Sequence, residues 1–126
     1  MGEPKLLPPS MRSFKRYIIF EVISEQPVAY IDLVNAIWNS MLNFLGETDT
    51  SDTKFWIIEN LYDNKSQQGV IKCKHDFVEK IRTVLSLIQV IGETKAIIKI
   101  IGVTGTIKSA KNKYLLKKDL TSFTEE

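Results

Sequence analysis

The sequence of 126 residues predicts an α+β sandwich with two helices on one face of an antiparallel sheet. Two observations lead to this class. Short runs rich in β-branched and aromatic residues alternate with two longer segments whose apolar residues recur every three or four positions. The 44% hydrophobic content over this length fits a single domain with one core.

The chain begins with a proline-bearing segment and a first strand. Residues 1–13 contain three prolines, which favour an extended arm over regular structure. Residues 14–24 are rich in aromatic and β-branched side chains. Their alternation places Ile18 and Phe20 on one face of a predicted strand and Ile19 on the other.

A first helix and a polar segment follow. Apolar residues between Val34 and Leu45 are spaced by three and four, which predicts an amphipathic helix. Gly46 stands where a left-handed helix terminator is expected. The polar residues 47–53 are predicted to form a loop. The carboxylates of this loop lack the ligand spacing of a calcium-binding loop, so we prefer a solvated loop to a metal site.

The second half of the domain is predicted to contain a hairpin and another helix. Strands are expected at residues 54–59 and 70–74, because turn-forming residues lie between them. Asp76 and Glu79 have the spacing of a capping box at a helix start. The apolar stripe that follows predicts a helix ending at Gly92.

The last strand is predicted at residues 96–103, so the order is β-α-β-β-α-β. This order is typical of a ferredoxin-like or RNA-recognition-motif-like α/β sandwich with an antiparallel sheet. We assign residues 14–115 to this single domain. Residues 1–13 are then the N-terminal arm, and a basic C-terminal extension leads into the tail at residues 116–126.

Positive charge is concentrated near the C-terminus. The segment from Lys95 to Lys118 contains seven lysines and no acidic residue. Within it, Thr104, Gly105 and Thr106 predict a turn that leads into a helix start. If the first and last strands are neighbours, their basic ends form one patch. Mobile ammonium groups beside free backbone N–H groups suit a polyanionic phosphate partner, so nucleic acid is the first partner to test.

The kind of basic residue indicates how such a partner is bound. The chain has fourteen lysines and three arginines, and reading of base edges favours arginine, so contacts to phosphate are expected over contacts to sequence. Solvated strand ends and a plain glycine turn remain alternative interpretations of these residues. The candidate RNA-binding residues are Lys15, Arg16, Lys72, Lys74, Thr104, Gly105, Thr106, Lys108, Lys111 and Lys113.

Catalytic and metal-binding functions have little support in the sequence. One cysteine and one histidine cannot supply the four ligands of a structural zinc site. Cys73 is interpreted as a core residue and His75 as a turn or surface residue. The single cysteine and the absence of a long apolar run predict a cytoplasmic protein without a membrane span.

The aromatic residues do not form an obvious stacking platform. The predicted strand at residues 70–74 has no aromatic ring, which disfavours base stacking on the sheet. Trp38 has helical spacing and is interpreted as a core residue, whereas the role of Trp56 stays open.

Four motifs occur in order along the chain: LPPSMR at 7–12, KRYIIF at 15–20, GVIKC at 69–73 and GVTGTIK at 102–108. Together they resemble ribonuclease P protein component 2, the Pop-type subunit family of archaea and eukaryotes, over roughly residues 6–114. The Leu-Pro-Pro motif points to the archaeal branch of this family.

The resemblance implies a noncatalytic protein subunit of a ribonucleoprotein that removes 5′ leaders from precursor tRNA. It implies binding to ribonuclease P RNA and to a TIM-barrel protein subunit, with a heterotetramer as the expected assembly. No cofactor is expected on the protein, and Mg²⁺ is expected on the partner RNA. The alternative is a ferredoxin-like assembly or regulatory module that binds only proteins.

Overall fold

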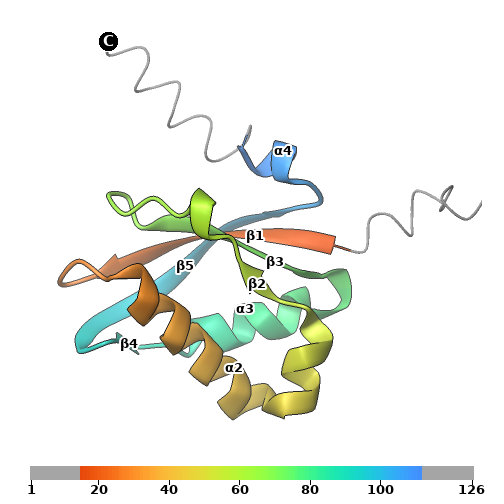
Figure 1. Cartoon of the computed structure of the whole chain (residues 1–126), viewed down its shortest axis with the longest axis horizontal. Coiled ribbons are helices and arrows are strands. Elements are labelled where there is room, and N and C mark those ends of the chain that lie inside the picture. Colours follow the sequence, from red (N-terminus) through yellow and green to blue (C-terminus); the bar gives the residue numbers. More distant parts are fainter. Residues whose placement is uncertain (1–14, 112–126) are drawn as a thin grey trace, which may run out of the picture.

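A five-stranded antiparallel sheet lies at the centre of the computed structural model, which describes residues 15–111 (Figure 1). The strand order is β2-β3-β1-β5-β4. The predicted α+β class and the antiparallel sheet are confirmed. The strands are β1 (Lys15–Ser24), β2 (Trp56–Ile57), β3 (Gln68–Lys74), β4 (Val90–Ile91) and β5 (Thr94–Thr104).

Helices lie on both sides of this sheet (Figure 1). Helices α2 (Tyr30–Thr53) and α3 (Val78–Ser86) pack on one face, as predicted, and enclose the main hydrophobic core. The short helix α4 (Ile107–Ala110) lies on the opposite face, which we call the outer face. The largest fully buried side chains of the main core are Ile18, Phe20, Leu33, Ile37, Met41, Ile71, Ile81, Leu85 and Ile91.

Alternation along β1 explains why this strand occupies the centre of the sheet. Ile18 and Phe20 point into the main core, and Ile19 belongs to a second, smaller cluster with Val70 and Ala110 on the outer face. Both faces of the strand therefore bury apolar side chains. β1 pairs with β3 and β5, which confirms that the first and last strands are neighbours.

Helix α2 differs from the prediction in its second part. The backbone leaves the helical conformation at Gly46 with φ of 81°, as expected for an interruption at this glycine. The predicted loop at residues 47–53 is wrong, because these residues form a further helical segment. Thr50 and Thr53 are buried within it, and the Thr50 hydroxyl donates to the Met41 carbonyl at 3.1 Å. The polar composition of residues 47–53 gave no indication of this buried threonine contact.

The hairpin that follows is shorter than predicted on one side. Lys54 ends α2 in the left-handed conformation with φ of 53°, so the strand begins only at Trp56. A 3-10 turn at Glu59–Leu61 follows directly. Gly69 on β3 lies against Phe20, since a Cβ at this position would stand 2.7 Å from the Phe20 ring.

The predicted start and end of the second helix are both wrong. Asp76 lies in a 3-10 turn at His75–Phe77, where its carboxylate contacts His75 Nε2 at 2.6 Å and caps no helix. Helix α3 ends at Ser86, although the apolar pattern continues. Ile88 and Ile91 are buried outside any helix, because the chain turns at Gly92 and β4 pairs with β5.

Candidate nucleic-acid interface

Strand register brings three of the predicted lysines together on the outer face. Lys15 on β1 pairs with Lys74 on β3, and the next pair whose side chains point to the outer face is Tyr17 with Lys72. Tyr17 also pairs with Thr104 on β5. Side chains that face each other across a ladder lie about 5 Å apart at Cβ. Residues from both ends of the sequence therefore meet at one end of the sheet.

The predicted turn at Thr104–Thr106 leads into α4 as expected. The Thr104 hydroxyl is buried and donates to the Thr106 carbonyl at 2.9 Å. The Thr106 hydroxyl caps α4 by accepting from the Ser109 N–H at 3.0 Å. Ala110 is fully buried against Ile19 and its neighbours, which holds the helix on the outer face. Gly105 is exposed at the tip of the turn.

Five lysines thus gather at this end of the sheet, and we call them the lysine cluster. Three are exposed and two, on β3, are half-buried. None of the five forms an ion pair with a carboxylate of residues 15–111. Ammonium groups without local counter-charge attract a polyanion. The lysine cluster consists of Lys15, Lys72, Lys74, Lys108 and Lys111.

Two of the predicted basic residues fall outside this cluster. Arg16 pairs with Cys73, which faces the main core, so Arg16 belongs to the opposite face of the sheet. Its guanidinium donates to the Lys15 carbonyl at 2.9 Å. Lys113 lies outside the described residues.

The lysine-rich segment from Lys95 is divided by the fold. Lys95 and Lys99 lie on β5 well before its end at Thr104. Lys95 lies nine positions before Thr104, or about 30 Å along the strand, and Lys99 lies five positions before it, or about 17 Å. Lys99 also pairs in register with Glu21 on β1. These two lysines are therefore remote from the lysine cluster.

The residues predicted for this surface did not include Trp56. Trp56 is the register partner of Lys72 and is 62% exposed, so an aromatic ring does stand on the sheet beside the lysines. Alternation with the buried Ile57 was the available signal for its outward position. The pairing of Trp56 with Lys72 could not be read from the sequence.

The structure does not favour catalysis by Cys73 or His75. Cys73 is 1% exposed, and burial raises the pKa of its thiol to about 11, with the Arg16 charge acting in the opposite direction. A protonated thiol is a poor nucleophile. His75 is a surface residue, as predicted. Residues 15–111 contain no group of three metal-ligating side chains.

Trp38 only partly matches its predicted core position. It is 37% exposed, and its ring contacts buried Phe55 with 4.5 Å between centroids. With Ile31 and Leu42 it forms an exposed apolar stripe on α2, because spacings of seven and four keep one helix face. Such a stripe is suited to a protein contact.

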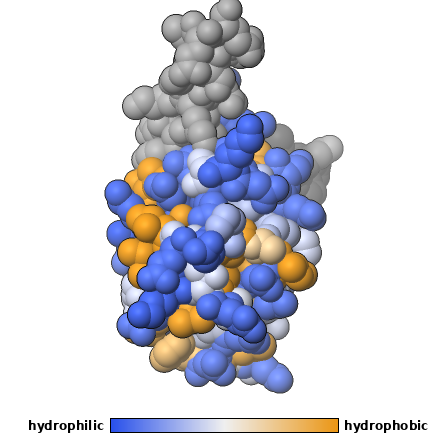
Figure 2. All heavy atoms as spheres, turned by 90° about the vertical axis from the view of Figure 1, so that its left-hand side faces the viewer, coloured by the Kyte–Doolittle hydropathy of each residue, from blue (hydrophilic) through white to orange (hydrophobic). Residues whose placement is uncertain are grey.

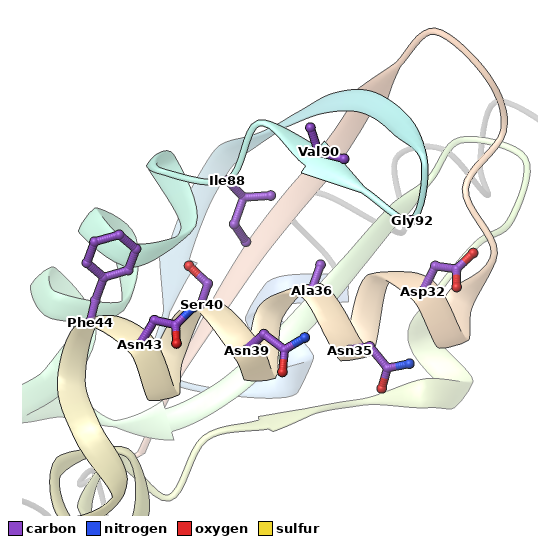
Figure 3. Close-up of a pocket in the computed structure, with 10 residues that line it drawn as sticks. All are labelled: Asp32, Asn35, Ala36, Asn39, Ser40, Asn43, Phe44, Ile88, Val90 and Gly92. Atoms are coloured by element: carbon purple, nitrogen blue, oxygen red, sulfur yellow. The ribbon is translucent and has the colours of Figure 1, made fainter.

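Two further surface features lie near β4. A groove between α2 and the β4 hairpin is lined by Asn35, Asn39 and Asn43, one turn apart along the helix (Figure 3). Figure 2 views the end of the molecule that holds β4, where hydrophobic atoms reach the surface among hydrophilic ones. Ile23 and Ile97 pair across β1 and β5 and are both exposed. Neither feature adjoins the lysine cluster.

No helix within residues 15–111 has the length and apolar content needed to cross a bilayer.

The fold and the lysine cluster together define a small α+β protein with one basic sheet end suited to a polyanionic partner. The model of the Rpp14/Pop5 family matches residues 16–115, and the chain belongs to this family. The resemblance seen in the sequence motifs is confirmed.

Relatives of known name are similar in sequence over most of this chain. Ribonuclease P protein component 2 of Pyrococcus furiosus is 45% identical over 112 residues, covering 89% of this chain and 92% of that protein. The protein of the same name from Methanothermobacter thermautotrophicus is 34% identical, covering 88% and 93%. A chain in a cryo-EM structure of yeast ribonuclease MRP is similar in fold, with a TM-score of 0.59, 10% identity and coverage of 90% and 93%.

Proposed function

We propose that this protein is a noncatalytic subunit of ribonuclease P, and that its lysine cluster binds the phosphate backbone of the enzyme's RNA. The relatives named ribonuclease P protein component 2 support the complex. The observation that carries the RNA contact is the meeting of Lys15, Lys72 and Lys74 on one sheet face without local carboxylate partners. Lys108 and Lys111 of α4 extend this charge beyond the sheet.

The fold proposed for this function is ferredoxin-like. The order β2-β3-β1-β5, with both helices on one face, supports that arrangement, and β4 adds an edge strand. Cleavage of the 5′ leader from precursor tRNA then belongs to the RNA, with Mg²⁺ held by its phosphates. The protein neutralises backbone charge, so the folded RNA needs less Mg²⁺. A cytoplasmic location is part of this proposal.

A TIM-barrel protein subunit is the proposed protein partner, within a heterotetramer. The exposed apolar stripe of Ile31, Trp38 and Leu42 supports a protein contact on α2. This stripe also supports the alternative function, a protein-binding assembly module without RNA. Substituting Leu42→Glu should weaken association with the TIM-barrel subunit and leave RNA affinity unchanged, because α2 lies on the face opposite the lysine cluster.

Reconstitution tests the proposed function directly. Precursor tRNA cleavage by ribonuclease P RNA should proceed at lower Mg²⁺ when the full chain and the TIM-barrel subunit are present. Omitting this chain should raise the Mg²⁺ requirement. An unchanged requirement, together with no retention of ribonuclease P RNA on the immobilised protein at moderate salt, would favour the protein-binding alternative.

A further inference from the structure

Trp56 is a large aromatic side chain exposed beside the lysine cluster. It is 62% exposed on β2, the edge strand of the sheet, while its neighbours Phe55 and Ile57 are buried. Its ring contacts no other aromatic ring of residues 15–111. The core therefore does not account for this indole. An exposed aromatic face is the feature on which nucleic-acid bases stack.

Positively charged side chains lie on one side of this indole. Lys72 is its direct partner across the ladder, and Lys74 and Lys15 form the next pair on the same face. Adjacent strands lie about 5 Å apart. A cation thus stands one strand away from the aromatic ring.

Trp56 also lines a hollow beside β2, the edge strand of the sheet. This hollow has a volume of about 570 Å³ and is lined by Tyr30, Trp56, Ile57, Ile58, Glu59 and Asn60. A carboxylate repels phosphate but accepts hydrogen bonds from the amino groups of bases. A carboxamide both donates and accepts. The hollow is therefore suited to the edge of a base and unsuited to a phosphate.

We propose that Trp56 stacks on an unpaired base of the bound RNA, with the base edge toward Asn60 and Glu59 and the adjoining phosphate at Lys72. This inference rests on the proposed function and adds a single-stranded element to it. A protein contact at the same place would have to supply a carboxylate to Lys72 as well as an apolar surface to the indole, because burying an unpaired ammonium is costly. RNA supplies both the aromatic ring and the negative charge.

Fluorescence of the full-length chain provides the first test. The sequence has two tryptophans, so Trp38→Phe leaves Trp56 as the reporter and keeps an aromatic contact with Phe55. Titration with single-stranded hexaadenylate should quench the Trp56 emission. An abasic hexamer with the same phosphates should not quench it, because it has no ring to stack.

Affinity for labelled hexaadenylate provides the second test. Trp56→Ala should weaken binding by about 5- to 150-fold, the range found for loss of one stacked base, while Trp56→Phe should retain most of the affinity. Phe44→Ala is the matched control, because Phe44 is 59% exposed on α2, away from the lysine cluster. Circular dichroism melts of each variant establish that the fold is kept.

The outcomes separate this inference from the proposed function. If Trp56→Ala binds hexaadenylate like the unmodified chain while neutralised lysines weaken binding, stacking is wrong and the proposed function stands. Equal losses for hexaadenylate and the abasic hexamer also overturn stacking. If the unmodified chain binds neither hexaadenylate nor ribonuclease P RNA, both proposals are wrong.

Discussion

Neutralising three residues of the lysine cluster gives a quantitative test of phosphate binding. We choose Lys15→Gln, Lys72→Gln and Lys74→Gln in one variant, because these lysines share the outer face and have no ion pairs within residues 15–111. Their loss removes positive charge without leaving a carboxylate unpaired. The sheet and core should therefore remain folded.

The expected magnitude follows from the number of phosphate contacts. If each of the five clustered lysines neutralises one phosphate, the logarithm of affinity falls with the logarithm of salt at a slope of roughly 4. Raising salt from about 50 to about 200 mM should then weaken binding about 250-fold. With two lysines left, the slope falls to roughly 1.6 and the same change in salt weakens binding only about 10-fold.

Salt titration of ribonuclease P RNA binding measures this slope. A control variant with Lys65→Gln, Lys95→Gln and Lys99→Gln removes the same charge from positions outside the cluster. Its slope should match that of the unmodified chain. Equal slopes for all three proteins, or an equal decrease in both variants, would show that binding depends on net charge or other residues and would refute the assignment of the cluster.

Three further predictions concern the folded state. Gly69→Ala should lower stability by about 1–3 kcal/mol in urea unfolding, since its Cβ would stand 2.7 Å from the Phe20 ring, whereas Gly105→Ala, with open space around it, should be neutral. Tyr62→Phe should raise stability by on the order of 1 kcal/mol, because the buried Tyr62 hydroxyl has no partner within residues 15–111, and Tyr30→Phe should not, because the Tyr30 hydroxyl donates to the Ile57 carbonyl at 3.4 Å. A thiol reagent at pH 8 should label Cys73 far more slowly in the folded protein than in urea. Rapid labelling of the folded chain would contradict the burial of this thiol. Since burial raises the pKa of the thiol from 9.0 to about 11, its contribution to stability is complete below pH 9 and is lost as the pH rises to about 11.

Local sequence patterns were sufficient to predict the elements with strong periodicity. The alternation in β1 correctly assigned Ile18 and Ile19 to opposite faces, because a strand has a fixed period of two. The turn at Thr104–Thr106 was predicted for a similar reason, since its glycine and hydroxyl residues act within a few positions of each other. The C-terminal end of α3 was missed because Ile88 is buried outside the helix and looks helical in spacing. Apolar spacing indicates which residues are buried, and here the buried residues continue past the end of α3 into β4.

The candidate surface depends on a quantity that no local pattern contains, the register between strands. Lys72 and Lys74 could be assigned to one face from alternation alone, but their partners Tyr17 and Lys15 follow from the pairing of β1 with β3. A shift of one residue in that register would place Arg16 beside the lysines and move Tyr17 away from Lys72. For the same reason the position of Trp56 beside Lys72 could not be predicted, because it is a consequence of the β2–β3 pairing. Composition indicated phosphate binding, whereas only the paired sheet adds a ring on which a base can stack.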